Sequence, residues 1–538
     1  MPDIGRAHRA GRLLLVLGAL LAVGVTLRYG VNGDIRYELG SQWTSMRSPA
    51  DTFTHRPLMY RLLMSVIALP AEALRRGITS YEMVLRVESI MIVTAASALL
   101  WAGVRRRWPD WALPVAVVVA AATLLLSPGI TFEPDWLAVP VTVAGVGVAL
   151  LGRPGGRIGP VVGGVLFAVA AVIKVITLPT AMIGLLVLWR LDRRRCWWST
   201  GAAVVAGIAW IVALATVWPH EIGWFFDSST IQPDRPPLDR VALTGELIGN
   251  AAWLWPVLIL FPAAAIRLGR RDGVLALLIM VLAWVPAPVQ NQFYIYHVPA
   301  VPVVAALALL PILRSRGWQA SVAVLTVIGA VLLNTPATWR VDNKVALFVV
   351  ALLIAGVAAV VQARSIRAVG DRSRRGAAQP VIAASLVVLA ALPPNLPGSA
   401  WTISMRQTSN TTNVSHARRT ADYVEQAEAV RKRIGPTATV TYLTFGDRNY
   451  TLRNPTTCRF PTNVFLQRSR TTKKQEGTLA WRENLTCLTE ADTDWLVWDK
   501  SWFALKGQPP VVLKAIKEKF DCDAGFVQGD LTVCPRRR

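Results

Sequence analysis

The sequence predicts a polytopic α-helical membrane protein with a small extracytoplasmic α/β domain at its C-terminus. Hydrophobic residues make up 53% of the 538 residues and charged residues only 17%, a balance more apolar than that of an ordinary soluble domain. The apolar residues come in blocks of roughly 20, the length at which a helix crosses the hydrocarbon core of a bilayer. The loops between these blocks are alternately basic and poor in cations, as expected when a chain crosses a membrane repeatedly.

A basic stretch at the N-terminus precedes the first apolar block, residues 13–27. This arrangement is similar to that of a signal peptide, but no small-residue cleavage site follows. We therefore expect an uncleaved first helix whose N-terminus faces the cytoplasm. The next loop, residues 30–82, is long. Its segment 56–74 is apolar but interrupted by Arg61, which is typical of an interfacial helix lying on the membrane.

Twelve further apolar blocks predict helices that cross the membrane in alternating directions, giving about thirteen in all. They are residues 83–104, 112–127, 136–152, 158–174, 177–191, 199–217, 247–266, 273–288, 298–313, 319–334, 345–362 and 379–394. Every short loop that this alternation places inside is basic, which supports the topology loop after loop. The bend near Lys174 and Pro179 leaves an alternative, one broken helix in place of the pair 158–174 and 177–191. That alternative would move every later loop to the other side.

After Pro397 the apolar blocks stop. We therefore divide the chain into a multi-span transmembrane domain, residues 1–395, and an extracytoplasmic α/β domain, residues 396–538. Within the second domain, apolar patterning predicts secondary structure of both kinds. The expected helices are residues 417–434 and 511–520, and the expected strands are residues 438–443, 495–498 and 525–533.

Four of the five cysteines, Cys458, Cys487, Cys522 and Cys534, lie in this last domain, whereas Cys196 stands alone. An even set in a polar domain favours two disulfides and an oxidising compartment. Of the three possible pairings we favour neighbours in order, Cys458 with Cys487 and Cys522 with Cys534. A zinc site is the alternative, but the spacing lacks a CxxC pair.

The formal net charge of +24 would suggest nucleic acid in a soluble protein. Here the cations cluster in short loops on alternating sides, where they orient the helices. No basic and aromatic array is present, so we expect no nucleic-acid partner. The expected environment is a lipid bilayer, in the cell membrane or an inner membrane.

Acidic residues in the predicted outer loops are candidates for chemistry. Asp34 follows the first helix by a few residues, and a partly desolvated carboxylate there suits a general base that takes a proton from a hydroxyl. From the sequence alone, the commoner reading is an acid that marks the helix end or pairs with Arg36. Glu133 and Asp135, two residues apart, could hold a divalent cation or orient a hydroxylated substrate. They could equally form a polar turn that opens the next helix.

Cationic and aromatic residues form a second set of candidates. Lys174 ends an apolar run on the outer side, where it could neutralise a phosphate or simply reach the interface from a helix end. His55, Arg56 and His297 are the other cations of this set. The segment 290–297 combines Gln290, Tyr294 and Tyr296 with His297. It suits sugar hydroxyls or a pyrophosphate, and equally an aromatic belt at the membrane interface.

Taken together, the acid after the first helix, the His55-Arg56-Pro57 start of the interfacial segment, the Glu133-Pro134-Asp135 loop, Lys174 and the 293–299 stretch resemble one family. This is the C-superfamily of polyprenyl-phosphate-sugar-dependent integral membrane glycosyltransferases, which includes protein mannosyltransferases and aminoarabinose and arabinofuranosyl transferases. The loose resemblance covers the whole chain. An outer α/β domain after the last helix is also common in that family.

The resemblance implies a sugar donor on a polyprenyl phosphate and an extracytoplasmic glycan, lipid or protein as acceptor. It implies that Asp34 is the base at the acceptor hydroxyl, and that cations stabilise the departing lipid phosphate. We favour Lys174, His297 and Arg56 for that role, in this order. Family members often carry two adjacent acids in the first loop, whereas here Glu38 is four residues from Asp34. Some members need a divalent metal ion and some do not. Glu133 and Asp135 are the residues that could bind such a cofactor here.

Two other function classes remain. A transporter or flippase of a lipid-linked or anionic substrate would place ionisable groups inside the membrane, and Arg86 and Glu88 within the second predicted helix favour it. A receptor or assembly protein would place its function in residues 396–538. We expect the glycosyltransferase.

Overall fold

The computed structural model divides the chain into two compact units. Unit 1 comprises residues 1–29, 86–208 and 234–415, and unit 2 comprises residues 30–85, 209–233 and 416–538. The structure describes residues 4–28, 31–54, 56–74, 78–125, 130–153, 155–229, 236–314, 316–368, 378–395, 413–444, 447–463, 466, 475–490, 492–505 and 508–537. His55, one of the predicted site residues, lies outside the described residues.

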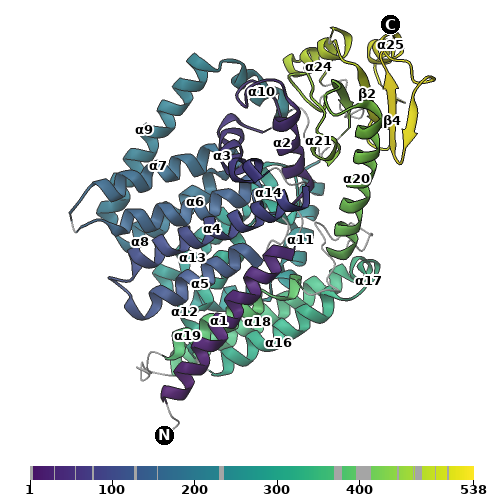
Figure 1. The fold of residues 1–538 in the computed structure, drawn as a ribbon. Helices are drawn as coiled ribbons and strands as arrows, with labels where there is room; N and C mark the ends of the chain where they lie inside the picture. Colours follow the sequence, from purple (N-terminus) through teal and green to yellow (C-terminus); the bar gives the residue numbers. More distant parts are fainter. Residues whose placement is uncertain are drawn as a thin grey trace. The chain divides into compact units, whose positions relative to one another are not determined.

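Unit 1 is helical (Figure 1). Helix α4 begins in unit 2, and helix α9 ends in unit 2. The other helices given in the next sentence lie wholly in unit 1. The elements are α1 (Ile4–Arg28), α4 (Ile78–Val104), α5 (Pro109–Leu125), α6 (Pro134–Leu151), α7 (Ile158–Val172), η1 (Val175–Thr177), α8 (Leu178–Leu191), α9 (Arg193–Val217), α11 (Pro237–Leu254), η2 (Pro256–Leu258), α12 (Phe261–Arg267), α13 (Gly269–Trp284), α14 (Pro286–Val289), η3 (Ile295–His297), α15 (Ala300–Leu309), η4 (Ile312–Arg314), α16 (Arg316–Leu333), α17 (Ala337–Asp342), α18 (Lys344–Ala368), α19 (Ala378–Ala390) and η5 (Pro393–Asn395).

Five of the described helices are long and apolar enough to cross a membrane, and seven shorter helices are apolar as well. The five lie at Tyr81–Val104, Pro134–Leu151, Arg193–Val217, Gly269–Val289 and Lys344–Ser365. The helix predicted over residues 247–266 is wrong as a continuous span. It is interrupted between α11 and α12, where Pro256 opens η2 and Pro262 stands at the start of α12, because a proline cannot donate a helical backbone hydrogen bond.

Close helix packing in unit 1 depends on small residues. Helix α6 packs against both α7 and α8. Where α4 crosses α6, a Cβ added to Gly147 would lie 2.5 Å from the backbone of Leu99 and Leu100, and one on Gly103 would meet the Gly147 carbonyl at the same distance. Only glycine allows two helices to approach this closely.

The bend near Lys174 separates two helices that pack against each other, α7 and α8. Helix α7 ends at Val172, and α8 begins at Leu178 after the short η1 turn. The Thr177 hydroxyl closes this turn by donating to the carbonyl of Lys174 at 2.6 Å. The chain therefore reverses direction at Lys174, in agreement with the predicted pair of helices.

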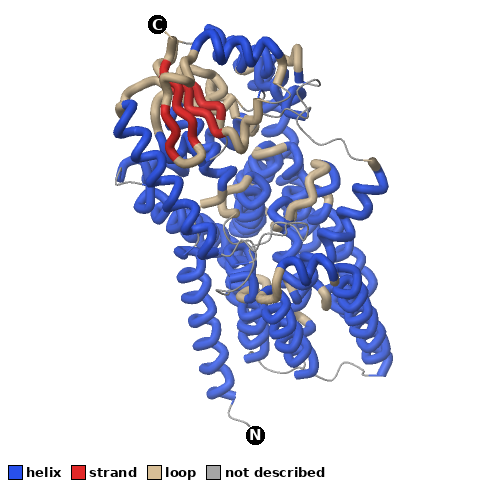
Figure 2. Tube along the Cα trace, turned by 90° about the vertical axis from the view of Figure 1, so that its right-hand side faces the viewer, coloured by secondary structure: helices blue, strands red, loops and turns tan. Residues whose placement is uncertain are grey.

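The α/β part of unit 2 is built on a β-sheet, drawn in red in Figure 2. The sheet has four strands in the order β1-β2-β4-β3. Strand β1 (Val440–Leu443) pairs in parallel with β2 (Trp495–Asp499), with Val440 opposite Trp495. Strand β4 (Leu531–Pro535) pairs antiparallel with β2 and with β3 (Phe526–Gln528). The helices of this part are α20 (Asn413–Ile434), α21 (Asp447–Leu452), α24 (Leu479–Glu490) and α25 (Pro510–Lys519).

Alternation along the strands gives this sheet two apolar faces. In β2, Val497 packs with Val430 of α20 on one face, and Leu496 packs with Ile516 of α25 on the other. The strands predicted at 438–443 and 495–498 are confirmed. The single strand predicted over residues 525–533 is wrong, because the chain turns between β3 and β4 at Gly529, whose φ is +57°.

Unit 2 also contains three helices outside the C-terminal segment, which are α2 (Gly33–Thr44), α3 (Leu58–Leu74) and α10 (His220–Ser229). The sequence predicted α3 but neither α2 nor α10. Helix α2 packs against α21. A Cβ on Gly40 would lie 2.5 Å from the backbone nitrogen of Tyr450, and the Trp43 ring stacks on the Tyr450 ring at 4.9 Å. The start of the long first loop is thus part of the same unit as the C-terminal sheet.

Two disulfides stabilise the C-terminal part of unit 2, Cys458–Cys487 and Cys522–Cys534. This is the pairing that the sequence favoured. The first joins the segment after α21 to α24, and the second ties the segment after α25 to β4. Cys196 in unit 1 is a buried free thiol.

Candidate functional site

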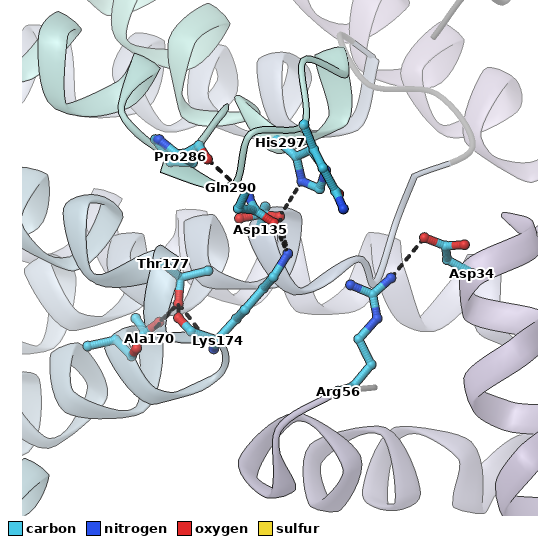
Figure 3. A network of polar contacts seen from close by, with 11 residues as sticks. Asp34, Arg56, Asp135, Ala170, Lys174, Thr177, Pro286, Gln290 and His297 are labelled. Carbon is cyan, nitrogen blue, oxygen red and sulfur yellow. Dashed lines mark hydrogen bonds and ion pairs between the residues drawn. The ribbon is translucent and has the colours of Figure 1, made fainter. Parts of the chain in front are cut away.

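In unit 1, four predicted site residues meet around the carboxylate of Asp135 (Figure 3). His297 Nδ1 lies 2.9 Å from Asp135 Oδ2, and Lys174 Nζ lies 3.4 Å from the same oxygen. Lys174 Nζ also donates to Gln290 Oε1. Asp135 and His297 are almost fully buried, whereas the Lys174 side chain remains 19% exposed. Lys174 is therefore the member of this cluster that a ligand can reach most easily.

The start of α6 positions Asp135. Glu133 is the N-cap residue, its carbonyl accepts the backbone N–H of Leu137 at 2.8 Å, and Asp135 stands in the first turn. The Trp136 indole, also buried, donates to the Thr123 carbonyl at 2.9 Å and holds α6 against the end of α5. A carboxylate in a first turn is stabilised by the positive end of the helix dipole. Glu133 is itself buried.

The segment 290–297 supplies the other side of this cluster. Gln290 Nε2 donates to the Pro286 carbonyl at 3.2 Å, which fixes its amide oxygen toward Lys174. Gln292 Oε1 lies 3.0 Å from His297 Nε2. Both His297 nitrogens thus face oxygens, and an imidazole protonated on both nitrogens can donate to each. Gln292 was not among the predicted site residues.

The two tyrosines of this segment stack on each other, with ring centroids 5.3 Å apart and an interplanar angle of 5°. The Tyr296 ring also contacts the His297 ring, at 4.3 Å. Both tyrosines remain partly exposed. Flat aromatic faces of this kind suit the apolar face of a sugar ring or a prenyl chain, besides an ordinary interfacial position.

In unit 2, Asp34 and Arg56 form an ion pair, with Arg56 Nη2 2.8 Å from Asp34 Oδ2 (Figure 3). Asp34 lies in the first turn of α2, and Arg56 lies two residues before the start of α3. The Asp34 side chain is 26% exposed and that of Arg56 only 5%. Asp34 pairs with Arg56 in the structure, whereas the sequence had suggested Arg36 as its structural partner. Arg36 instead lies 2.9 Å from Glu82.

Glu38 stands one turn after Asp34 on α2 and is fully buried. Gln42 Nε2 donates to Glu38 Oε1 at 2.8 Å. Burial raises the pKa of Glu38, and this outweighs the opposing effects of a hydrogen bond from Thr54 and of the nearby Arg61. The second acid of the first loop is therefore a fully buried group with a raised pKa, and it differs in this from the more accessible Asp34.

Arg61 anchors this region from the start of α3. Its fully buried guanidinium pairs with Glu221 of α10 and donates to the Thr52 carbonyl. Burial raises the pKa of Glu221, although Arg61 opposes the shift. The sequence had treated Arg61 as an interruption of an apolar helix. No local pattern indicates its partner, which is 160 positions away.

The residues considered for a divalent metal do not fit one. Among the described residues, no group of three or more His, Cys, Asp and Glu side chains is placed to hold a metal ion. One carboxylate oxygen of Asp135, Oδ2, lies against the Lys174 ammonium and His297. A divalent cation there would be repelled by the ammonium.

The described part of the chain thus combines many apolar helices with an α/β part that carries two disulfides. The fold is similar to that of ArnT from Cupriavidus metallidurans in the apo state, with a TM-score of 0.51 and 16% sequence identity over 97% of each chain. ArnT bound to undecaprenyl phosphate gives a TM-score of 0.52 with the same identity and coverage. The predicted resemblance is thus confirmed for the fold.

The Archaeoglobus fulgidus oligosaccharyltransferase in complex with Zn and sulfate is more distant. Its TM-score is 0.37 at 12% identity, over 94% of this chain and 71% of that chain. No family model matches this sequence, and no curated protein matches it.

Proposed function

We propose that this protein is an integral membrane glycosyltransferase that moves a sugar from a polyprenyl-phosphate donor to an extracytoplasmic glycan, lipid or protein. The observation that carries the proposal is the fold shared over 97% of both chains with ArnT, a protein crystallised with undecaprenyl phosphate. The sugar and the acceptor are left unspecified, because no described contact selects one.

The proposed topology has about thirteen spans, with the N-terminus in the cytoplasm and the C-terminal α/β domain outside. The basic loops of the sequence support this orientation. The two disulfides support it independently, because such bonds persist in oxidising compartments.

In the proposed reaction, the acceptor hydroxyl oxygen forms a bond to the anomeric carbon of the sugar. The bond from that carbon to the phosphate oxygen breaks, and its electron pair leaves with the lipid phosphate. Asp34 accepts the hydroxyl proton, as a general base within reach of solvent. Two observations support this role of Asp34. Its side chain is 26% exposed, and its carboxylate is oriented by the nearly buried Arg56.

Lys174, His297 and Arg56 are proposed to stabilise the negative charge of the donor phosphate. Lys174 and a protonated His297 together outweigh the single negative charge of Asp135, so their cluster would carry a net positive charge. Asp135 and Gln290 fix the direction of the Lys174 ammonium, which lowers the cost of ordering it when the donor binds.

The proposal is tested by supplying the purified protein in proteoliposomes with labelled polyprenyl-phosphate sugars and candidate acceptors. Transfer of label to an acceptor, with release of the polyprenyl phosphate, supports the proposal. Absence of transfer and of hydrolysis across the donor panel, in a preparation that unfolds cooperatively, contradicts it.

A lipid or anion transporter is a second candidate, favoured by one observation inside a predicted span. The buried carboxylate oxygens of Glu88 hydrogen-bond to no residue in the described part of α4 or its neighbours. Nearby Arg86 donates from Nη1 to the Leu27 carbonyl at 2.8 Å. A buried ionisable group without a hydrogen-bond partner inside a membrane helix is typical of transport pathways. Movement of labelled lipid across the bilayer without sugar transfer would favour this function.

A further inference from the structure

A pocket of about 320 Å³ lies in unit 1 where three short inter-helix loops meet. The loops follow α4, α6 and α8. Asp135 stands in the first turn of α6, whereas the pocket lies beyond the last turn of the same helix. At 1.5 Å per residue, the length of α6 separates the two places by roughly 27 Å. The pocket is therefore distinct from the candidate functional site.

The polar lining of the pocket is mostly cationic. It consists of four arginines and one acid, Arg106, Arg107, Arg194, Arg195 and Asp192. Asp192 forms ion pairs with two of the four arginines. Its Oδ2 lies 2.6 Å from Arg107 Nη2 and 3.2 Å from Arg195 Nε. Four positive charges against one negative charge leave an excess of three. A concave surface with such an excess attracts a multivalent anion.

The pocket is held in shape by its own arginines. The buried Arg195 donates to the carbonyl of Ala149 at 2.8 Å and to that of Gly152 at 2.7 Å, at the end of α6. Arg107 ties the end of α8 through Asp192 and the Leu191 carbonyl. Two guanidiniums thus fix the loops, while Arg106 and Arg194 form no ion pair with any described residue and project at the exposed rim.

Glycines leave the remaining wall open. Gly152, Gly155 and Gly156 line the pocket, and a Cβ on Gly155 would meet nothing within 4 Å. The φ of Gly155 is +83°, a conformation that other residues rarely adopt. The backbone of this loop is therefore accessible to an anion without an intervening side chain.

One large aromatic side chain lines the pocket, and further exposed apolar side chains stand close to the lining residues in the chain, which indicates a lipid in preference to a free ion. Trp198 lines it and is 38% exposed, the adjacent Trp197 is 65% exposed, and Ile158, at the start of α7, is 82% exposed. Tryptophans at helix ends favour the membrane interface. Acyl chains would cover these side chains while a headgroup phosphate enters the pocket.

We infer that this pocket binds the phosphate headgroup of an anionic phospholipid. Basic pockets between membrane helices are known to hold such headgroups. Arg106 and Arg194 contact the phosphate, and Arg107 and Arg195 keep the loops in place. The inference does not depend on the proposed enzymatic reaction, because binding can be measured without turnover.

The test measures lipid binding to the full-length chain in detergent by native mass spectrometry. The probes are phosphatidylglycerol and phosphatidylcholine with identical acyl chains, and inorganic phosphate serves as competitor. The double variant Arg106→Gln with Arg194→Gln removes the two rim charges. The control, Arg270→Gln with Arg271→Gln, removes the same charge from two exposed arginines at the start of α13, neither of which lines the pocket.

We expect wild type and control to bind phosphatidylglycerol in preference to phosphatidylcholine, and the pocket variant to bind it about thirtyfold more weakly. Equal weakening in the pocket variant and the control would overturn the inference, since the lipid would then respond to overall charge alone. Binding of both lipids with the same affinity would also overturn it. Displacement of the lipid by an equimolar amount of inorganic phosphate would identify a free phosphate as the ligand and overturn the lipid assignment.

Discussion

The guanidinium of Arg56 lies 2.8 Å from the carboxylate of Asp34, with the arginine almost buried and the aspartate a quarter exposed. The cation is therefore the fixed partner and the acid the accessible one. This asymmetry is what a base oriented by its neighbour requires, because the acid must reach a ligand while its direction stays constrained.

Replacing Arg56 by glutamine is expected to lower the rate of sugar transfer by about 10- to 100-fold, because a misdirected base loses much of its effect. Arg56→Lys should recover part of the rate by keeping the charge. The measurement is kcat in proteoliposomes, with Arg47→Gln as the control, since Arg47 is an exposed arginine of the same loop. An Arg56→Gln protein with the kcat of wild type would remove this residue from the account.

Lys174→Gln is expected to raise the KM for the donor by about 10- to 150-fold, because one charge-assisted contact to a phosphate contributes on the order of 1.5–3 kcal/mol. The melting temperature is measured alongside, because the substitution also removes a cationic partner of the buried Asp135 carboxylate. The matched control is Lys344→Gln, which also removes a lysine paired with a carboxylate, Glu246, at 2.8 Å. A rise in KM of the same size in both variants contradicts a specific role for Lys174.

Glu38→Gln is expected to stabilise the protein at neutral pH. Burial raises the pKa of Glu38 above its ordinary value of 4.5. A carboxyl with a raised pKa contributes its full stability below 4.5 and loses it as pH rises through the folded pKa. The neutral amide does not carry this loss, so the apparent melting temperature of the variant should exceed that of wild type increasingly as pH rises.

The control for this comparison is Glu428→Gln, at an exposed position of α20. Burial raises the pKa of Glu221 as well. Glu221 therefore adds a pH dependence of stability with the same sign to wild type and to Glu38→Gln. A difference in melting temperature between Glu38→Gln and wild type that stays constant with pH would show that the Glu38 carboxyl does not titrate differently on folding.

The denatured, unreduced protein is expected to react with one maleimide, at Cys196, because the four other cysteines are in disulfides. After reduction, all five cysteines should react. Mass spectrometry of protein taken directly from membranes measures both states. Two or more additions before reduction would contradict the disulfides and weaken the extracytoplasmic placement of this domain.

Many of the apolar helices and the strands β1 and β2 could be predicted because apolar period and length are local properties of the sequence. Helix α2 could not, because it is a mixed polar segment whose buried side chains include Arg36, Glu38 and Ser41. Its stability comes from partners far along the chain, such as the Tyr450 ring that stacks on Trp43. No window of neighbouring residues contains that information.

The candidate site divides in the same way. Individual residues such as Asp135 and His297 could be singled out by type and by their place in a predicted loop. Their pairing could not, because the two residues are 162 positions apart and meet only when η3 packs near the start of α6. Gln292 was missed because an amide in an aromatic segment has no distinguishing local pattern.

The central claim is that Asp34 is the base of a sugar transfer from a polyprenyl-phosphate donor. The most direct measurement compares Asp34→Asn with wild type in proteoliposomes, with Asp51→Asn as a control from the same loop. We predict that Asp34→Asn lowers kcat by about a thousandfold, while its melting temperature and donor binding stay close to those of wild type and the control stays active. An Asp34→Asn protein that transfers sugar at the wild-type rate would contradict the account.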